Sequence, residues 1–188
     1  MSTLYSIALP IGNLEDITLR ALRILKEVDF IVCEDTRRTG ILLNYYHIKK
    51  PLISYHQHSK LQKIDYIIQE LKNGKNIALV TDAGTPAISD PGGVLIAEAL
   101  KNKIKVEPIP GPSALTAILS VAGIPADKFL FVGYLPKKKG RRTFFDTYKN
   151  FDYPTIFFES PQRVKKTLGE IQNFWSDCQV IIGRELTK

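Results

Sequence analysis

The sequence has few of the residues on which metal centres depend, and no run that could cross a membrane. Its 188 residues include two cysteines, three histidines and one tryptophan. Cys33 and Cys178 lie in separate apolar runs and form no metal-ligand spacing, so we expect buried thiols in a reducing compartment and no metal site. The apolar runs fall well short of the roughly 20 residues of a transmembrane helix. The N-terminus lacks the basic segment of a signal peptide, and together these absences predict a cytoplasmic protein without a membrane partner.

The bulk composition is that of a globular protein with a basic surplus. Hydrophobic residues make up 44% of the chain and charged residues 24%, which is typical of a soluble domain and disfavours disorder. A length of 188 residues allows one ordinary domain or two small ones. The net charge of +7, from 26 basic and 19 acidic residues, would attract polyanions such as RNA and speed their encounter with the protein.

Apolar, β-rich runs alternate with segments of helical periodicity. Strands are expected at residues 4–9, 30–35, 76–81 and 105–110, and helices at residues 18–28, 36–46, 59–74, 93–102 and 113–123. Leu19 and Leu61 are expected on the buried faces of the first and third helices. Ser59 and Gln62 have the spacing of a capping box at the start of the third. The alternation predicts an α/β domain with a largely parallel sheet.

Glycine, proline and acidic residues gather where four of the expected strands end. The clusters are PIGN (10–13), CEDTR (33–37), TDAGTP (81–86) and PIPGPS (108–113). Ligands of open α/β sheets bind outside the carboxyl ends of the strands, so we expect the four clusters to form a single site. The stretch TDAGTPAISDPG (81–92) is long for a connector and has few bulky side chains. We interpret it as the cradle of a ligand.

The pattern restarts after AGIPAD (122–127), which we interpret as a linker between an N-terminal domain at residues 1–121 and a C-terminal α/β domain at residues 128–188. The second domain is expected to hold a mixed sheet, with strands at 129–135, 154–160 and 178–183 and helices at 143–151 and from Pro161 onward. It has only about 60 residues and stops directly after an expected strand. A unit of that size buries little apolar surface, so we expect it to be incomplete, or completed by a partner.

Seven consecutive motifs give the chain a family resemblance. They are PIGNLEDIT (10–18), CEDTR (33–37), DAGTPAISDPG (82–92), PIPGPSA (108–114), FVGYLPKK (131–138), FFESPQR (157–163) and GRELTK (183–188). In this order they resemble the ribosomal small-subunit methyltransferase I group of the tetrapyrrole methylase-like enzymes. The resemblance implies a two-domain α/β fold, S-adenosylmethionine in a cleft between the domains, and a homodimer. It also implies 2′-O-methylation of a cytidine ribose in the decoding region of small-subunit ribosomal RNA, free or assembled into the subunit.

The strand-end clusters supply candidate contacts for the implied cofactor. The expected cofactor-binding residues are Pro10, Ile11, Gly12, Asp82, Gly84, Thr85, Ile88, Ser113 and Ala114. Backbone groups of the loop would satisfy the amino-acid end of S-adenosylmethionine, and Asp82 or the Thr85 hydroxyl its polar edges. Many relatives in the wider superfamily have Gly-Asp-Pro where this chain has Gly-Thr-Pro at residues 84–86, so the carboxylate role would fall to Asp82 or Asp90. The alternative for Asp90 is the N-cap of a helix with Pro91 at its first position.

The candidate catalytic residues are Glu34, Asp35, Arg37 and Glu159. Glu34 and Asp35 end a buried strand, where adjacent carboxylates are costly unless they are used or paired. Alternation along the strand sends only one of the two side chains into the cleft. A carboxylate there could orient a ribose hydroxyl or take its proton, and Arg37 could hold a phosphate. An internal ion pair with Arg37 or Arg38 is the structural alternative.

Glu159 ends another expected strand. Ser160 and Pro161 after it fit the N-cap and first position of a helix. Glu159 and Arg163 then remain for chemistry in the cleft or for pairing between the domains.

A run of five cations in six positions, KKKGRR (137–142), is the strongest signal for RNA. A solvated face is the usual explanation for such a run, but this one follows an expected strand end in a basic chain. The expected RNA-binding residues are Lys137, Lys138, Lys139, Arg141, Arg142 and Arg163. Neutralising about five phosphates predicts a log–log salt slope of roughly −3.5 to −4.5. Tyr134, Phe145 and Tyr148 could stack an unpaired base, although Phe145 also suits a core.

Other functions stay open at this point. A methyltransferase of porphyrin or corrin precursors would also use a basic cleft, because its substrate is a polycarboxylate, but the motifs at residues 33–37, 137–142 and 159–163 belong to the ribosomal group. A chain that binds RNA or the cofactor without catalysis is the second alternative. A nicotinamide dinucleotide enzyme is disfavoured, since no G-x-G-x-x-G follows the first strand.

Overall fold

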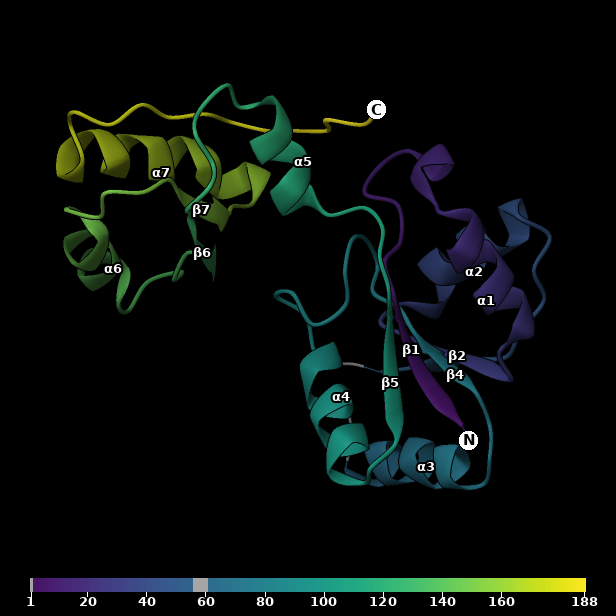
Figure 1. Ribbon diagram of the computed structural model, residues 1–188. Coiled ribbons are helices and arrows are strands. Elements are labelled where there is room, and N and C mark those ends of the chain that lie inside the picture. The colour runs from purple at the N-terminus through teal and green to yellow at the C-terminus, as the bar shows by residue number, and fades with distance from the viewer. Residues whose placement is uncertain (1, 56–60) are drawn as a thin grey trace. The chain divides into compact units, whose positions relative to one another are not determined.

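The structure is a computed structural model that describes residues 2–55 and 61–188 (Figure 1). The chain forms two compact units, Met1–Ala117 with Glu185–Lys188, and Ile118–Arg184. The predicted linker at residues 122–127 lies shortly after this division, within the second unit. The capping box predicted with Ser59 lies outside the described residues.

A five-stranded sheet forms the centre of the first unit. Its order is β3-β2-β4-β1-β5 and all neighbouring strands are parallel. The strands are β1 (Thr3–Ile7), β2 (Phe30–Cys33), β3 (Leu52–Ser54), β4 (Ile77–Leu79) and β5 (Lys105–Ile109). β1 lies between β4 and β5, with Leu4 opposite Ile77 and Val106, and Leu4 is fully buried. Strands covered on both faces are mainly apolar, as β2 (FIVC) and β4 (IAL) are here, and the predicted parallel sheet is confirmed.

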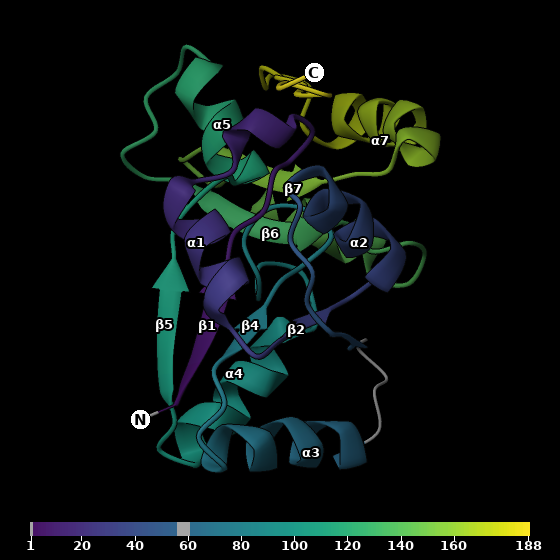
Figure 2. The same cartoon turned by 90° about the vertical axis from the view of Figure 1, so that its right-hand side faces the viewer.

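Helices cover both faces of this sheet. They are the 3-10 helix η1 (Leu14–Asp16), α1 (Leu19–Glu27), α2 (Thr36–Tyr45), α3 (Leu61–Lys72) and α4 (Gly92–Lys101). α1 and α2 lie on one face and α3 and α4 on the other (Figure 1, Figure 2). Ile24, Leu42 and Leu43 pack into the first core, and Ile67 and Leu95 pack into the second. The three-layer arrangement leaves the carboxyl ends of the strands to the loops.

Two leucines that were expected on buried helix faces are exposed. Leu19 is 86% exposed and Leu61 is 78% exposed, and each is the first residue of its helix. The buried face of α1 runs through Ala21, Ile24 and Leu25, which at 100° per residue lies opposite Leu19. The predicted faces were wrong at these two positions because the apolar pattern begins before the helix meets the core.

The second unit has a two-stranded parallel sheet. β6 (Leu130–Tyr134) pairs with β7 (Thr155–Phe158), and α6 (Arg141–Tyr148) and α7 (Pro161–Phe174) follow the two strands. α5 (Ala114–Val121) contains the division between the units. The small core joins Leu135, Phe145 and Ile171, and the Trp175 indole donates to the Phe145 carbonyl at 2.9 Å. Phe145 therefore belongs to the core.

Residues 178–183 are not a strand, which corrects the sequence-based expectation. Val180, Ile181 and Ile182 are 43%, 37% and 59% exposed, and Cys178, expected to be buried, is exposed. Their β-branched composition favours a strand, but a strand needs a neighbour for its hydrogen bonds. In the described part of the second unit only β6 and β7 pair, and they are parallel, so the expected mixed sheet is not formed there.

Candidate active site

The segments that follow β1, β4 and β5 are held together by backbone contacts. Leu9 and Gly84 exchange two hydrogen bonds, each of 2.9 Å, in an isolated antiparallel bridge. Ala8 N donates to Ile109 O at 3.2 Å, and the Thr85 hydroxyl donates to Pro112 O at 3.4 Å. Three of the four predicted clusters therefore meet at the carboxyl edge of the sheet.

Glycine is required at the centre of this junction. Gly84 has φ +77°, in the left-handed region that favours glycine. A Cβ built on it would lie 3.6 Å from Ile11 Cγ2 and 3.9 Å from Pro112 O. The loop after β4 thus passes close to both neighbouring segments.

Residues 82–92 form a rigid loop organised by Asp90. Ala87 and Ser89 have φ values of +69° and +64°, which are uncommon for side chains other than glycine. Asp90 Oδ1 accepts from Ala87 N at 2.8 Å and from Gly92 N at 2.7 Å. α4 begins at Gly92, with Pro91 as its N-cap. The helix therefore starts one residue later than in the predicted arrangement, which had Asp90 as the N-cap. Asp90 still supports the helix start through its bond from Gly92 N. The other carboxylate oxygen, Oδ2, is buried without a hydrogen-bond partner in the described part of the chain.

Asp82 joins the loop to the end of β2. Its Oδ1 accepts from Asp35 N at 3.2 Å, and its Oδ2 lies 3.3 Å from Arg38 Nη1. The neighbouring hydroxyl of Thr81 donates to Glu34 Oε1 at 3.2 Å. The fourth predicted cluster therefore reaches the same edge. Thr81 belongs to the predicted TDAGTP cluster but was not among the individual site residues, although its place between an apolar run and Asp82 was a usable signal.

Asp35 and Arg37 form the ion pair that was the structural alternative. Asp35 is the N-cap of α2 and accepts from Arg37 N at 2.8 Å, and its Oδ2 lies 2.8 Å from Arg37 Nη2. The side-chain and backbone hydrogen bonds from Arg37 hold the pKa of Asp35 far below its usual range. A carboxylate so committed is a weak base at neutral pH, which leaves Glu34 as the stronger candidate of the two.

We expect the stabilising effect of the Asp35–Arg37 pair to depend on pH in a defined direction. Because the folded-state pKa of Asp35 is depressed, its contribution is fully present above the ordinary value of about 3.9 and is lost as pH falls through the lowered pKa. Asp35→Asn keeps a good N-cap but removes the charge. Urea unfolding should show a constant difference between variant and wild type from about pH 5 to 8. The difference should shrink below about pH 4; growth on acidification would contradict the assigned pair.

Glu159 is enclosed in the second unit. Its side chain is 6% exposed and its Oε1 lies 2.6 Å from Arg163 Nη2. Oε1 also accepts from Ser160 N at 2.8 Å, and Oε2 accepts from the Thr167 hydroxyl at 2.7 Å. Ser160 and Pro161 take the predicted N-cap and first helical positions of α7, although the Ser160 side chain makes no cap hydrogen bond. The structure gives Glu159 a role in holding α7 to the end of β7.

Arg141 is the centre of the same network, which corrects its expected place on the RNA surface. Its side chain is 7% exposed and its Nη2 lies 2.6 Å from Glu170 Oε2. Nη1 donates to Pro136 O at 2.9 Å and lies 3.7 Å from Glu159 Oε2. The hydrogen bond to Glu170 raises the pKa of Arg141 above its ordinary value. With its guanidinium used internally, Arg141 is not available to a phosphate.

The other cations of the basic run are at the surface. Lys137, Lys138 and Lys139 are exposed, and the Arg142 side chain is 85% exposed. Arg163, by contrast, is 25% exposed and bound to Glu159. Among the aromatic side chains expected to stack a base, Tyr134 is 59% exposed, whereas Tyr148 packs on Phe144 at 4.8 Å between ring centroids.

The described residues contain no group of three or more His, Cys, Asp or Glu side chains that could hold a metal ion. None of the helices within them is both long and apolar enough to cross a membrane. The site at the sheet edge consists of carboxylates, hydroxyls and backbone groups of a rigid loop.

Comparison with known proteins identifies the family. The model of the tetrapyrrole (corrin/porphyrin) methylases matches residues 3–188. "Ribosomal RNA small subunit methyltransferase I" of Thermotoga maritima is 49% identical over 188 residues, which cover 100% of this chain and 85% of that protein. The protein of the same name from Halalkalibacterium halodurans is 49% identical over 187 residues, covering 99% of this chain but only 65% of that protein. The chain thus spans about two thirds of the length of most of these relatives.

Solved structures agree on the fold. Diphthine synthase matches with a TM-score of 0.70 at 15% identity, covering 94% of this chain and 72% of that one. Uroporphyrin-III C-methyltransferase from Thermus thermophilus matches with a TM-score of 0.63 at 17% identity, covering 93% and 77%. With the family match and the identities to the relatives, the chain belongs to the tetrapyrrole (corrin/porphyrin) methylase family, in its ribosomal RNA small subunit methyltransferase I group.

Proposed function

We propose that this chain transfers a methyl group from S-adenosylmethionine to the 2′-hydroxyl of a cytidine ribose in the decoding region of small-subunit ribosomal RNA. The observation that carries the proposal is the 49% identity to a relative named for methylation of that RNA, over the whole chain. The porphyrin or corrin alternative has less support, because the porphyrin methyltransferase structures are only 21% and 17% identical and show the fold alone.

The loop at residues 82–92 has features that fit S-adenosylmethionine. Asp90 Oδ2 is a buried acceptor without a partner in the described residues, which suits the ammonium group of the cofactor. Ile88 is 45% exposed and offers apolar surface beside it. Gly84 and Thr85 are fixed by their bonds to the neighbouring segments. We propose that these residues hold the cofactor, together with the other predicted contacts at Pro10, Ile11, Gly12, Asp82, Ser113 and Ala114.

When bound, S-adenosylmethionine supplies a methyl group on a sulfonium, which is already a good leaving group. The protein then has to hold the ribose hydroxyl in line and exclude water. We assign the orientation and deprotonation of that hydroxyl to Glu34, which lies at the end of β2 with its carboxylate on the Thr81 hydroxyl. Asp82, through Asp35 N and Arg38, would fix the loop against β2. Arg37, with 87% of its side chain exposed, would contact a phosphate.

We further propose that the chain works as a homodimer in the cytoplasm, on RNA that is free or assembled into the small subunit. The support is the family resemblance and the basic composition. The homodimer can be checked by sedimentation at several protein concentrations, and a monomer at all of them would overturn it.

The exposed cations predict the salt dependence of RNA binding. With Arg141 and Arg163 engaged in the second unit, four cations remain in the basic run, and the expected log–log slope becomes roughly −2.8 to −3.6. Replacing Lys137, Lys138 and Lys139 by glutamine should reduce that slope by about 2 to 3. Fluorescence anisotropy at increasing KCl concentrations measures it. Cofactor affinity should stay at the wild-type value, and an unchanged slope would remove these lysines from the RNA surface.

Calorimetric titration with S-adenosylmethionine, and with S-adenosylhomocysteine for comparison, tests the cofactor half of the proposal. Micromolar binding of both compounds is expected for the wild-type chain. Absence of heat at millimolar concentrations of either compound would contradict the assigned loop.

A further inference from the structure

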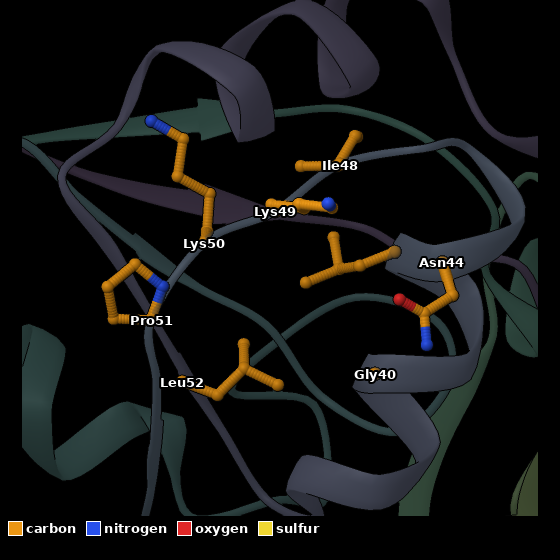
Figure 3. A pocket seen from close by; sticks show the side chains of 8 residues that line it. Gly40, Asn44, Ile48, Lys49, Lys50, Pro51 and Leu52 are labelled. Carbon is orange, nitrogen blue, oxygen red and sulfur yellow. The ribbon is translucent and has the colours of Figure 1, made fainter.

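A pocket lies apart from the strand-end site, where the end of α2 turns into β3. Its volume is about 420 Å³, within the range of roughly 300–1,000 Å³ typical of small-molecule sites. It is lined by Gly40, Leu43, Asn44, Ile48, Lys49, Lys50, Pro51 and Leu52 (Figure 3). All of these residues belong to the first unit, and none of them was predicted as a site residue.

The walls of the pocket are fixed by the turn after α2. Ile48 N donates to Leu43 O at 2.8 Å and His47 N to Asn44 O at 3.1 Å, with His47 in the left-handed region at φ +55°. These bonds are those of a Schellman motif, in which the residue beyond the turn packs back on the helix. Ile48 and Leu43 are 4% and 3% exposed. These bonds fix the backbone on the α2 side of the pocket.

Gly40 has no role in the fold that requires glycine. It lies inside α2, where glycine is unfavourable relative to alanine, and its φ is not among the positive values. A Cβ built on it would have nothing within 4 Å. The local effect of the missing side chain is to leave the pocket open.

The lining has the chemistry of a nucleotide site. Pro51 and Leu52 provide apolar surface for a base, and the Asn44 amide offers both donors and an acceptor for a base edge. Figure 3 shows Asn44 and Leu52 on opposite sides of the pocket, with the Lys50 side chain extending away from both. Lys49 and Lys50 form no ion pair with any other residue that the structure describes. Their ammonium groups can therefore pair with phosphates.

The outer face of α2 connects this pocket with the strand-end site. Arg37, Ile41 and Tyr45 are four residues apart and lie on one face of the helix. The Arg37 side chain is 87% exposed, and Ile41 and Tyr45 are 69% and 58% exposed. An exposed cation, an apolar side chain and an aromatic side chain in one row suit a single nucleic-acid strand.

We propose that the pocket between α2 and β3 binds one unpaired nucleotide of the substrate RNA, a few nucleotides from the one that is methylated. The base enters against Pro51 and Leu52, Asn44 contacts its edge, and Lys49 and Lys50 hold the adjoining phosphates. The site anchors the RNA strand along α2. The inference rests on the proposed function in that RNA is the substrate.

The test measures binding of a fluorescent single-stranded RNA of mixed sequence and about 12 nucleotides to the intact 188-residue chain. Gly40→Leu fills the pocket with a good helix former, and Gly40→Ala is its size control. Gly169→Leu is a matched control, because Gly169 is also a helix glycine with open space around it but lines no part of this pocket. Lys49→Gln with Lys50→Gln removes the two charges, and Lys26→Gln with Lys72→Gln removes two elsewhere. Thermal unfolding and S-adenosylmethionine titration establish that each variant is folded.

The double lysine variant should bind the RNA about 25-fold more weakly at about 0.1 M salt, because each single-strand phosphate contact contributes roughly 0.7 to the log–log slope. Gly40→Leu should weaken binding by about 5-fold or more, and the three control variants by less than about 2-fold. The 5′-monophosphates of the four ribonucleosides serve as a second probe. If they bind the pocket while RNA affinity is unaffected by its variants, the site is one for free nucleotides and the proposal is wrong.

Two further results separate this proposal from the proposed function. Wild-type RNA binding that is unchanged in Gly40→Leu and in the double lysine variant overturns the pocket assignment alone. A wild-type chain that binds S-adenosylmethionine but no RNA overturns both.

Discussion

Arg141→Ala is expected to lower the free energy of unfolding of the second unit by about 3–5 kcal/mol, the usual cost of removing one partner from a buried ion pair. Arg141 is 6% exposed. Its removal leaves Glu170 without the cation that contacts it and leaves Glu159 paired with Arg163 alone. It also leaves the Pro136 carbonyl without its side-chain donor. Urea or thermal unfolding followed by Trp175 fluorescence measures the loss, since the indole packs in the same small core.

Arg142 provides the matched control for this prediction. It is the next residue in the chain, but 85% of its side chain is exposed and its nearest carboxylate, on Asp146, is 3.8 Å away. Exposed pairs of this kind contribute little, so Arg142→Ala should change the unfolding free energy by no more than about 0.5 kcal/mol. Equal effects of the two substitutions would show that the buried network does not hold this unit together.

Asp90→Ala is expected to weaken S-adenosylmethionine binding about 100-fold, equivalent to about 2.7 kcal/mol. The substitution removes the acceptor of the hydrogen bonds from Ala87 N and Gly92 N, which brace the loop on either side of its left-handed residue Ser89. A loop released from that conformation has to be reordered at a cost when the cofactor binds. The assigned acceptor for the ammonium group of the cofactor is lost as well.

Asp90→Asn separates the two roles of this side chain. An asparagine keeps the Oδ1 acceptor, so the loop and the thermal stability should remain close to wild type. It places an NH₂ group where Oδ2 accepts, so affinity should fall by about 10-fold, or about 1.4 kcal/mol. Titration calorimetry of both variants measures the effect. Wild-type affinity in Asp90→Ala would show that the loop is not the cofactor site.

The parallel sheet and its strand-end loops were predictable because they depend on local patterns. Apolar runs such as that of β4 are buried on both faces, and glycine and proline mark the loops that follow them. The meeting of Gly84 with Leu9 follows from the rule that parallel strands end at one edge. Both features are encoded by residues that lie within a few positions of one another in the sequence.

The partners of charged side chains were not predictable in the same way. Arg141 lies in a run of five cations, yet its partner Glu170 is 29 residues away, and only the packing of α6 against α7 brings them together. The exposure of residues 178–183 likewise depends on whether a neighbouring strand is present. The pocket beside Gly40 could not be predicted either. It depends on the turn at His47, and no local sequence pattern shows that Leu52 will lie opposite Asn44.

The most direct test of the central claim is transfer of a labelled methyl group. The chain is incubated with S-adenosylmethionine labelled in its methyl group and with small-subunit ribosomal RNA, free or in assembled subunits, and in parallel with a porphyrin precursor. Alkaline hydrolysis then locates the label, since a 2′-O-methyl group protects the adjoining phosphodiester. We expect label in the RNA alone, at a 2′-O-methylcytidine of the decoding region, and its loss in Glu34→Gln. Label in the porphyrin precursor, or none in RNA although the cofactor binds, would contradict the account.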